Sequence, residues 1–286
     1  MGKVRNKIPL FIASILLILS VIFLAFPTVS NALYQAENQS TITKYNSSIS
    51  SISKKEKEKY LYQARQYNES LTETVSDAFV ASAYENIKPD YESVLNFNDG
   101  QICSVEIPKI NVNLPVYHGT SEDVLTKGAA HSANTSFPIG GKNTHSVISA
   151  HTAYPGKVFF DDLTELDKGD IFYINVLDEK LTYKVCDISI AEPDDTSKLQ
   201  IVYNKDLVTL VTCYPYAVNS HRLLVTGERV ENDTTDSTRD ELNESKEQRN
   251  SFLPAVVIFI GIALIIFLII FAIRKILTKS KDSNKI

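Results

Sequence analysis

The stretch LVTLVTCYPYAVNSHRLLVTGERV, residues 207–230, decides the class of fold. Two apolar, β-branched runs, 207–213 and 222–230, flank a turn of aromatic and polar residues. Runs of this composition separated by a short turn predict two antiparallel strands. Cys213 ends the first strand and Arg222 begins the second, so we expect both at the same end of the sheet.

Further candidate strands lie upstream of this pair, separated by Gly, Pro, Asn or Asp. They cover residues 103–107, 112–116, 145–151, 170–177 and 181–190. Many short strands with turn signals between them predict a closed barrel or a sandwich. We therefore expect a mainly β domain over residues 100–230, with short helices between some strands.

The composition excludes several classes of protein. The chain has 286 residues, of which 44% are hydrophobic and 22% charged, so wholesale disorder is not expected. A net charge of −5 argues against a nucleic-acid binder with a basic surface. Three cysteines cannot build a disulfide scaffold.

Residues 27–99 are polar, and we expect one or two helices over residues 35–75 packed beside the β domain. Four residues with a 4-3-4 spacing share one helical face: Tyr60, Ala64, Tyr67 and Leu71. The charged run 54–59 suits a helix start or a linker. Residues 231–251 are polar and acidic and predict a linker.

Two uncharged apolar runs, 8–26 and 252–273, are each long enough to cross a bilayer, which takes roughly 20 helical residues. We expect a transmembrane helix at each end of the chain. The first run is also compatible with a cleaved signal peptide, although it exceeds the usual length of about 7 to 15 apolar residues. Lysines and arginines in the tails 1–7 and 274–286 place both tails in the cytoplasm, with the intervening residues outside.

The strand ends carry side chains suited to acyl-transfer chemistry. A guanidinium stabilises a neighbouring thiolate and donates hydrogen bonds to an oxyanion, which suits Cys213 and Arg222. His151 follows a strand and can exchange protons with a leaving or an attacking group. Taken alone, these residues also fit a core cysteine, a surface arginine and a loop histidine. Four other histidines compete by residue type: His118, His131, His145 and His221.

Several segments resemble the sortases, a family of cysteine transpeptidases from the surface of Gram-positive bacteria. They are TLVTC (209–213), PYAVNSHRLLVTGER (215–229), VEIPKINVNLPVYHGTSEDVLTKGAAH (105–131), SAHTAYPGKVFFDDLTELDKGD (149–170) and EPDDTSKL (192–199). The resemblance covers the whole β domain and implies a closed eight-stranded barrel. The terminal spans and the polar N-terminal segment look like class C, the pilin-polymerising sortases.

The resemblance also implies a role for each site residue. Cys213 matches the nucleophile, His151 the general acid and base, and Arg222 the residue that steadies the oxyanion. The family's substrates carry an LPxTG-like signal, which is cut between Thr and Gly and joined to a pilin Lys amine. No cofactor and no metal are implied.

Class C sortases resemble one another in an N-terminal lid, Asp-Pro followed by an aromatic residue. The nearest match is Asp77-Ala78-Phe79, in which Asp77 would pair with Arg222 and Phe79 would cover Cys213. Ala78 replaces the proline and allows more backbone freedom, so we expect a looser lid. An ordinary helix or linker is the alternative for this segment.

Other readings remain open at this stage. Cys103 and Cys186 suit buried apolar positions, or a bridge if their Cα atoms lie within about 7 Å. Acidic residues at 192, 194 and 195 fit a solvated turn better than a calcium loop. The competing functions are a housekeeping sortase that anchors surface proteins to the cell wall, and a non-catalytic tethered assembly factor. A papain-like hydrolase is disfavoured because its nucleophile begins a helix.

Overall fold

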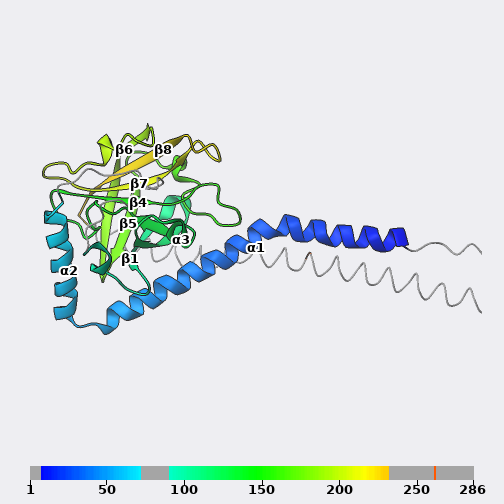
Figure 1. Cartoon of the computed structure of the whole chain (residues 1–286), viewed down its shortest axis with the longest axis horizontal. Coiled ribbons are helices and arrows are strands. Elements are labelled where there is room, and N and C mark those ends of the chain that lie inside the picture. Colours follow the sequence, from blue (N-terminus) through cyan, green and yellow to red (C-terminus); the bar gives the residue numbers. More distant parts are fainter. Residues whose placement is uncertain (1–7, 72–89, 232–260, 262–286) are drawn as a thin grey trace, which may run out of the picture. The chain divides into compact units, whose positions relative to one another are not determined.

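The computed structural model describes residues 8–71, 90–231 and 261 (Figure 1). Eight strands form the β domain: β1 (Gln101–Ile107), β2 (Val112–His118), β3 (Ala129–His131), β4 (Thr144–Ser149), β5 (Ile171–Val176), β6 (Glu179–Ala191), β7 (Asp206–Tyr214) and β8 (His221–Arg229). The α-helices are α1 (Ile8–Ser51), α2 (Lys54–Glu69) and α3 (Glu122–Leu125). Single 3-10 turns are η2 (Tyr91–Ser93), η3 (Pro108–Ile110), η4 (Leu163–Glu165) and η5 (Ser197–Leu199).

The strands close into a barrel in the order β1-β2-β3-β4-β7-β8-β6-β5. The β2–β3 and β4–β7 pairs are parallel and the others are antiparallel. The expected closed eight-stranded barrel is therefore confirmed. The sequence did not predict β3, because three residues are too few to show an alternating pattern.

Both faces of β7 are covered, which explains its nearly continuous apolar sequence. Val208 and Leu210 point to one face and Leu207 and Val211 to the other, since side chains alternate along a strand. All four are buried. A strand buried on both faces reads as an apolar run rather than as an alternation.

The expected helices beside the barrel are confirmed. On α1, four buried residues with a 4-3-4 spacing form one face: Asn38, Ile42, Tyr45 and Ile49. The charged run 54–59 begins α2, where Ser53 and Glu56 form a capping box. Near the end of α2, the Asn68 side chain makes hydrogen bonds of 3.2 Å and 2.8 Å to the backbone C=O and N–H of Phe137. This amide clamp holds α2 against the barrel.

The chain divides into two compact units. One contains the beginning of α1, up to Tyr34, and the other contains the rest of α1, α2 and the barrel. The first part of α1 exposes large apolar side chains, among them Leu16, Phe23 and Leu24. Among the described residues, this helix is the one that is long and apolar enough to cross a membrane. The second expected span, 252–273, lies outside the described residues except for residue 261.

Of the two cysteines expected to be buried, one is exposed. Cys103 is fully buried on β1, as expected, but Cys186 on β6 is exposed, and the two are not bridged. The reason is the alternation along β6, where Val185 faces the core and its neighbour must face outward. A shift in register between Val185 and Asp187 interrupts the β6–β8 ladder at this point.

Tyr45 connects α1 to strand β1 and to the turn between β5 and β6. Its hydroxyl donates to the C=O of Ile102 and accepts from the N–H of Leu177, each at 2.9 Å. Tyr45→Phe leaves the buried Leu177 N–H without this acceptor, so we expect a loss of about 1–3 kcal/mol in the free energy of unfolding. Denaturant titration of the full chain in detergent measures this. Tyr62→Phe, at an exposed position on α2, is the control and should change little.

A second feature of the packing is a cluster of aromatic and imidazole rings around His131. The His131 ring stacks on Phe137 with 5.0 Å between ring centroids, and its Nε2–H donates to the C=O of Ser136 at 2.9 Å. The Tyr91 hydroxyl lies 3.0 Å from Nδ1. Burial lowers the pKa of His131 from 6.5 to about 3.

This burial predicts a loss of stability in acid. Below pH 6.5, His131 becomes protonated in the unfolded chain. In the folded chain the same residue stays neutral down to about pH 3. The free energy of unfolding should therefore fall by about 1.4 kcal/mol per pH unit from this residue, and burial lowers the pKa of His118 and His145 in the same direction. Denaturant titrations at pH 7, 6 and 5 check this. Equal stability at the three values would contradict it, and His131→Phe should reduce the slope.

Candidate active site

The register of β7 and β8 places Cys213 directly opposite Arg222. Opposed residues in an antiparallel pair project from the same face of the sheet, so the thiol and the guanidinium share one face at one rim of the barrel. Cys213 is partly exposed and Arg222 is buried. The expectation from sequence that these two residues lie at the same sheet end is confirmed.

The turn between the two strands holds the guanidinium in place. Nη1 of Arg222 donates to the C=O groups of Asn219 and His221, at 3.3 Å and 3.1 Å. The turn begins with a cis Tyr214–Pro215 bond, and the Pro215 C=O accepts the N–H groups of Val218 and Asn219. Backbone carbonyls of the loop thus orient a cationic side chain beside the thiol.

His151 reaches the same rim from the neighbouring strand. β4 ends at Ser149, two residues earlier than expected, and the chain then stays bound to β7. The N–H of Ala150 donates to the Val211 C=O at 3.1 Å, and the Thr212 hydroxyl donates to the Ala150 C=O at 2.8 Å. These bonds bring the residue after Ala150 to the end of β7, where Cys213 lies.

The loop that follows His151 is tied back on itself. The Phe160 N–H donates to the C=O of His151 at 3.0 Å. The Asp161 carboxylate accepts the N–H groups of Ala153 and Phe159, each at 2.9 Å. The Tyr154 ring stacks on the imidazole at a centroid distance of 5.3 Å, and the Phe159 ring meets it edge-on at 6.0 Å. The Tyr154 and Phe159 rings also meet edge-on at 5.7 Å, so the three rings form one cluster that restricts the imidazole.

Burial and nearby charge act on His151 in opposite directions. Burial lowers the pKa of the imidazole and is the larger effect, while Glu122 and then Asp161 raise it. Oε1 of Glu122 lies 3.6 Å from Nε2, a distance that suits an ion pair better than a hydrogen bond. No local sequence pattern points to either acid, because Glu122 belongs to a remote segment and Asp161 is separated from His151 by a loop.

The other histidines serve the packing or lie on another face. His118 bonds the C=O groups of Gly100 and Val94, and His145 lies between the Gln200 C=O and the Thr209 hydroxyl. His131 belongs to the buried aromatic cluster. His221 adjoins Arg222, but alternation turns it to the other face, where it contacts Glu192 at 3.1 Å.

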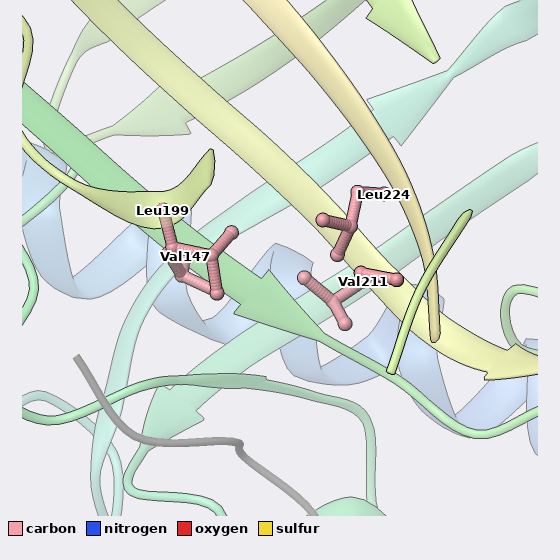
Figure 2. Close-up of a cluster of buried hydrophobic side chains, with 5 residues drawn as sticks. Val147, Leu199, Val211 and Leu224 are labelled. Carbon is pink, nitrogen blue, oxygen red and sulfur yellow. The ribbon is translucent and has the colours of Figure 1, made fainter. Parts of the chain in front are cut away.

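An apolar hollow adjoins Arg222 on the face that carries Cys213. Figure 2 shows Val147, Val211 and Leu224 on neighbouring strands, with Leu199 of η5 beside them. The rest of the lining is largely polar and comprises Ser149, Glu192, Pro193, Asp195, Thr196 and Arg222. Its apolar floor suits an apolar side chain of a peptide bound beside Arg222. The sequence did not separate these residues from the core, because a groove floor and a core strand have the same composition.

Two remaining expectations concern metals and the lid. Among residues 8–71 and 90–231, no three His, Cys, Asp or Glu side chains are grouped to hold a metal ion. Residues 192, 194 and 195 are exposed, and Asp195 accepts the Ser197 N–H at 3.1 Å, as in a solvated turn. Asp77 and Phe79 lie outside the described residues.

The barrel and this grouping of thiol, imidazole and guanidinium are those of a cysteine transpeptidase. The model of the sortase domain matches residues 105–230. Sortase C-1 from Streptococcus pneumoniae superimposes with a TM-score of 0.64 at 37% identity, over 68% of this chain and 100% of that one. Sortase C-1 from Actinomyces oris gives a TM-score of 0.57 at 44% identity, over 61% and 97%.

Curated relatives agree with the structural ones. Sortase A of Bacillus anthracis is 30% identical over 148 residues, which are 50% of this chain and 68% of that protein. Sortase D of Bacillus subtilis (strain 168) is 33% identical over 135 residues, 46% of this chain. The match covers 65% of the length of sortase D. The chain belongs to the sortase family, whose members are cysteine transpeptidases.

Proposed function

We propose that this protein is a membrane-anchored class C sortase that polymerises pilins. It would cleave an LPxTG-like signal between Thr and Gly and join the new carboxyl end to a Lys amine of another pilin. The pairing of Cys213 with Arg222 across β7 and β8, with His151 just beyond the end of the adjacent strand β4, carries the proposal.

In the first half-reaction, the Cys213 thiolate attacks the carbonyl carbon of the substrate Thr. The guanidinium of Arg222 stabilises the thiolate and then donates hydrogen bonds to the oxyanion of the tetrahedral intermediate. As the C–N bond breaks, protonated His151 gives its proton to the leaving Gly nitrogen. The products are a thioacyl enzyme and a free Gly amine. The apolar hollow beside Arg222 would hold the Leu-Pro part of the signal.

In the second half-reaction, a Lys amine attacks the thioester carbonyl and His151 accepts a proton from the attacking nitrogen. Collapse of the second tetrahedral intermediate expels the thiolate and leaves an amide between the Thr carbonyl and the Lys side chain. Aminolysis exceeds hydrolysis if the pilin holds its amine against the thioester while the aromatic rings beside His151 limit access of water.

Two observations favour pilin polymerisation over cell-wall anchoring. The solved relatives at 37–44% identity are sortase C proteins, one of them a group B Streptococcus sortase from a pilus island. Another sortase C of S. pneumoniae, 39% identical, is described for its pilin substrate specificity. The polar segment before the barrel and the apolar run 252–273 also fit class C.

The same proposal includes the membrane topology. The apolar start of α1 would anchor the chain, and 252–273 would form a second span. The basic tails 1–7 and 274–286 would then lie in the cytoplasm and the barrel outside. In this arrangement the site meets exported pilins at the outer surface of the membrane.

The central prediction concerns covalent multimers. The full chain in detergent, incubated with a pilin that bears an LPxTG signal, should yield a ladder of pilin multimers stable in SDS, and a short LPxTG peptide should leave a thioacyl adduct on Cys213 detectable by mass spectrometry. Cys213→Ala should abolish both, because the nucleophile is lost. Cys186→Ala, which removes an exposed thiol, is the matched control and should retain both.

Other outcomes identify the competing functions. An adduct on Cys213 together with transfer only to cell-wall peptide amines, and no pilin ladder, indicates a housekeeping sortase. The absence of both the adduct and the ladder indicates a non-catalytic assembly factor and overturns the proposal.

We further propose that Asp77 and Phe79 form a lid over the site, as the family resemblance implies. Asp77→Ala combined with Phe79→Ala should raise the rate at which a small alkylating agent modifies Cys213, because the thiol loses its cover. Mass spectrometry of timed samples measures this rate, with the exposed Cys186 as the internal reference. An unchanged ratio of the two rates would contradict the lid.

A further inference from the structure

Glu122 stands beside His151 although the two residues are distant in sequence. It is the first residue of α3, and its carboxylate reaches Nε2 of His151 at 3.6 Å. The helix is one turn long and is held by the buried side chain of Leu125 and by backbone bonds from the N–H groups of Val124 and Leu125 to the Ser121 C=O. The backbone of Glu122 is thus fixed relative to the rim, while its side chain is 74% exposed.

The other groups around the imidazole are engaged in different contacts. Both carboxylate oxygens of Asp161 accept backbone N–H groups of the loop that carries His151. Tyr154 and Phe159 cover the ring from its face and its edge. Cys213 and Arg222 come from β7 and β8, and Glu192 and Asp195 line the hollow beside Arg222. Glu122 places a carboxylate oxygen 3.6 Å from Nε2 of His151, where it can form an ion pair with the protonated ring.

We propose that Glu122 is a positioning residue, which holds the proton on Nε2 of His151 and turns Nδ1 toward Cys213 and the leaving amine. The inference rests on the proposed function of this site. In imidazolium form both nitrogens carry a proton, and Nδ1–H is given to the Gly nitrogen as the Thr–Gly bond breaks. The neutral ring then keeps its proton on Nε2, because the negative carboxylate 3.6 Å away attracts an N–H there and repels a lone pair, so Nδ1 accepts the next proton from the Lys amine. A carboxylate beside histidine selects the tautomer in this way in other enzymes.

The carboxylate also favours the charged imidazole, against the effect of burial. Glu122 and Asp161 both act to raise the pKa of His151, while burial lowers it. Since the side chain of Glu122 is largely exposed, water and salt screen the interaction, and the effect on rate should be modest.

The test compares Glu122→Gln with Asp123→Asn in the full chain. Asp123 is the adjacent exposed acid of α3 and provides the matched control. For Glu122→Gln we expect kcat/KM for thioester formation to fall about two- to fivefold, and the imidazole limb of its pH profile to move to lower pH by about half a unit. Raising the ionic strength should shrink the difference from the native chain.

An NMR titration separates this inference from the proposed function. With ¹³C-labelled histidine, and the His151 signal assigned from a His151→Gln variant, Glu122→Gln should shift the midpoint of His151 to lower pH, and Asp123→Asn should not. An unchanged midpoint and rate, with the pilin ladder intact, overturns the role of Glu122 alone. A shifted midpoint without any ladder or adduct retains the contact and overturns the proposed function instead.

Discussion

The register of β7 against β8 is the constraint on which the candidate site depends. In this register Cys213 opposes Arg222, and Thr209 opposes Thr226 with a 2.8 Å hydrogen bond between their hydroxyls. A slip of one residue would turn the thiol away from the face that carries the guanidinium, because side chains alternate along a strand. The same register sets Val211 beside Leu224 and so forms the floor of the apolar hollow.

The position of His151 is fixed by contacts within its loop rather than by strand register. It lies in a loop, yet backbone hydrogen bonds on both sides of it and two aromatic rings restrict its position. Burial opposes the charge of the imidazole and two carboxylates favour it. Burial has the larger effect, so the pKa of His151 lies below its usual value.

Two buried polar side chains hold the helices α1 and α2 against the barrel. Tyr45 and Asn68 both bond to barrel backbone groups through buried side chains. Buried polar contacts of this kind favour one arrangement of helix and sheet, because a displaced helix would leave their partners unpaired. The packing therefore gives residues 35–71 a defined place on the barrel.

The sequence by itself determined the strand-rich domain, the helices beside it and the thiol–guanidinium pair, since these depend on local composition and on one short turn. The resemblance of its segments to the sortase family also pointed to His151. Only the tertiary structure decided the closure of the barrel through the parallel β4–β7 pair, the exposure of Cys186 and the contact between Glu122 and His151. These features join residues far apart in the chain, and no local pattern records which distant segments will meet, because packing and long-range hydrogen bonding make that choice.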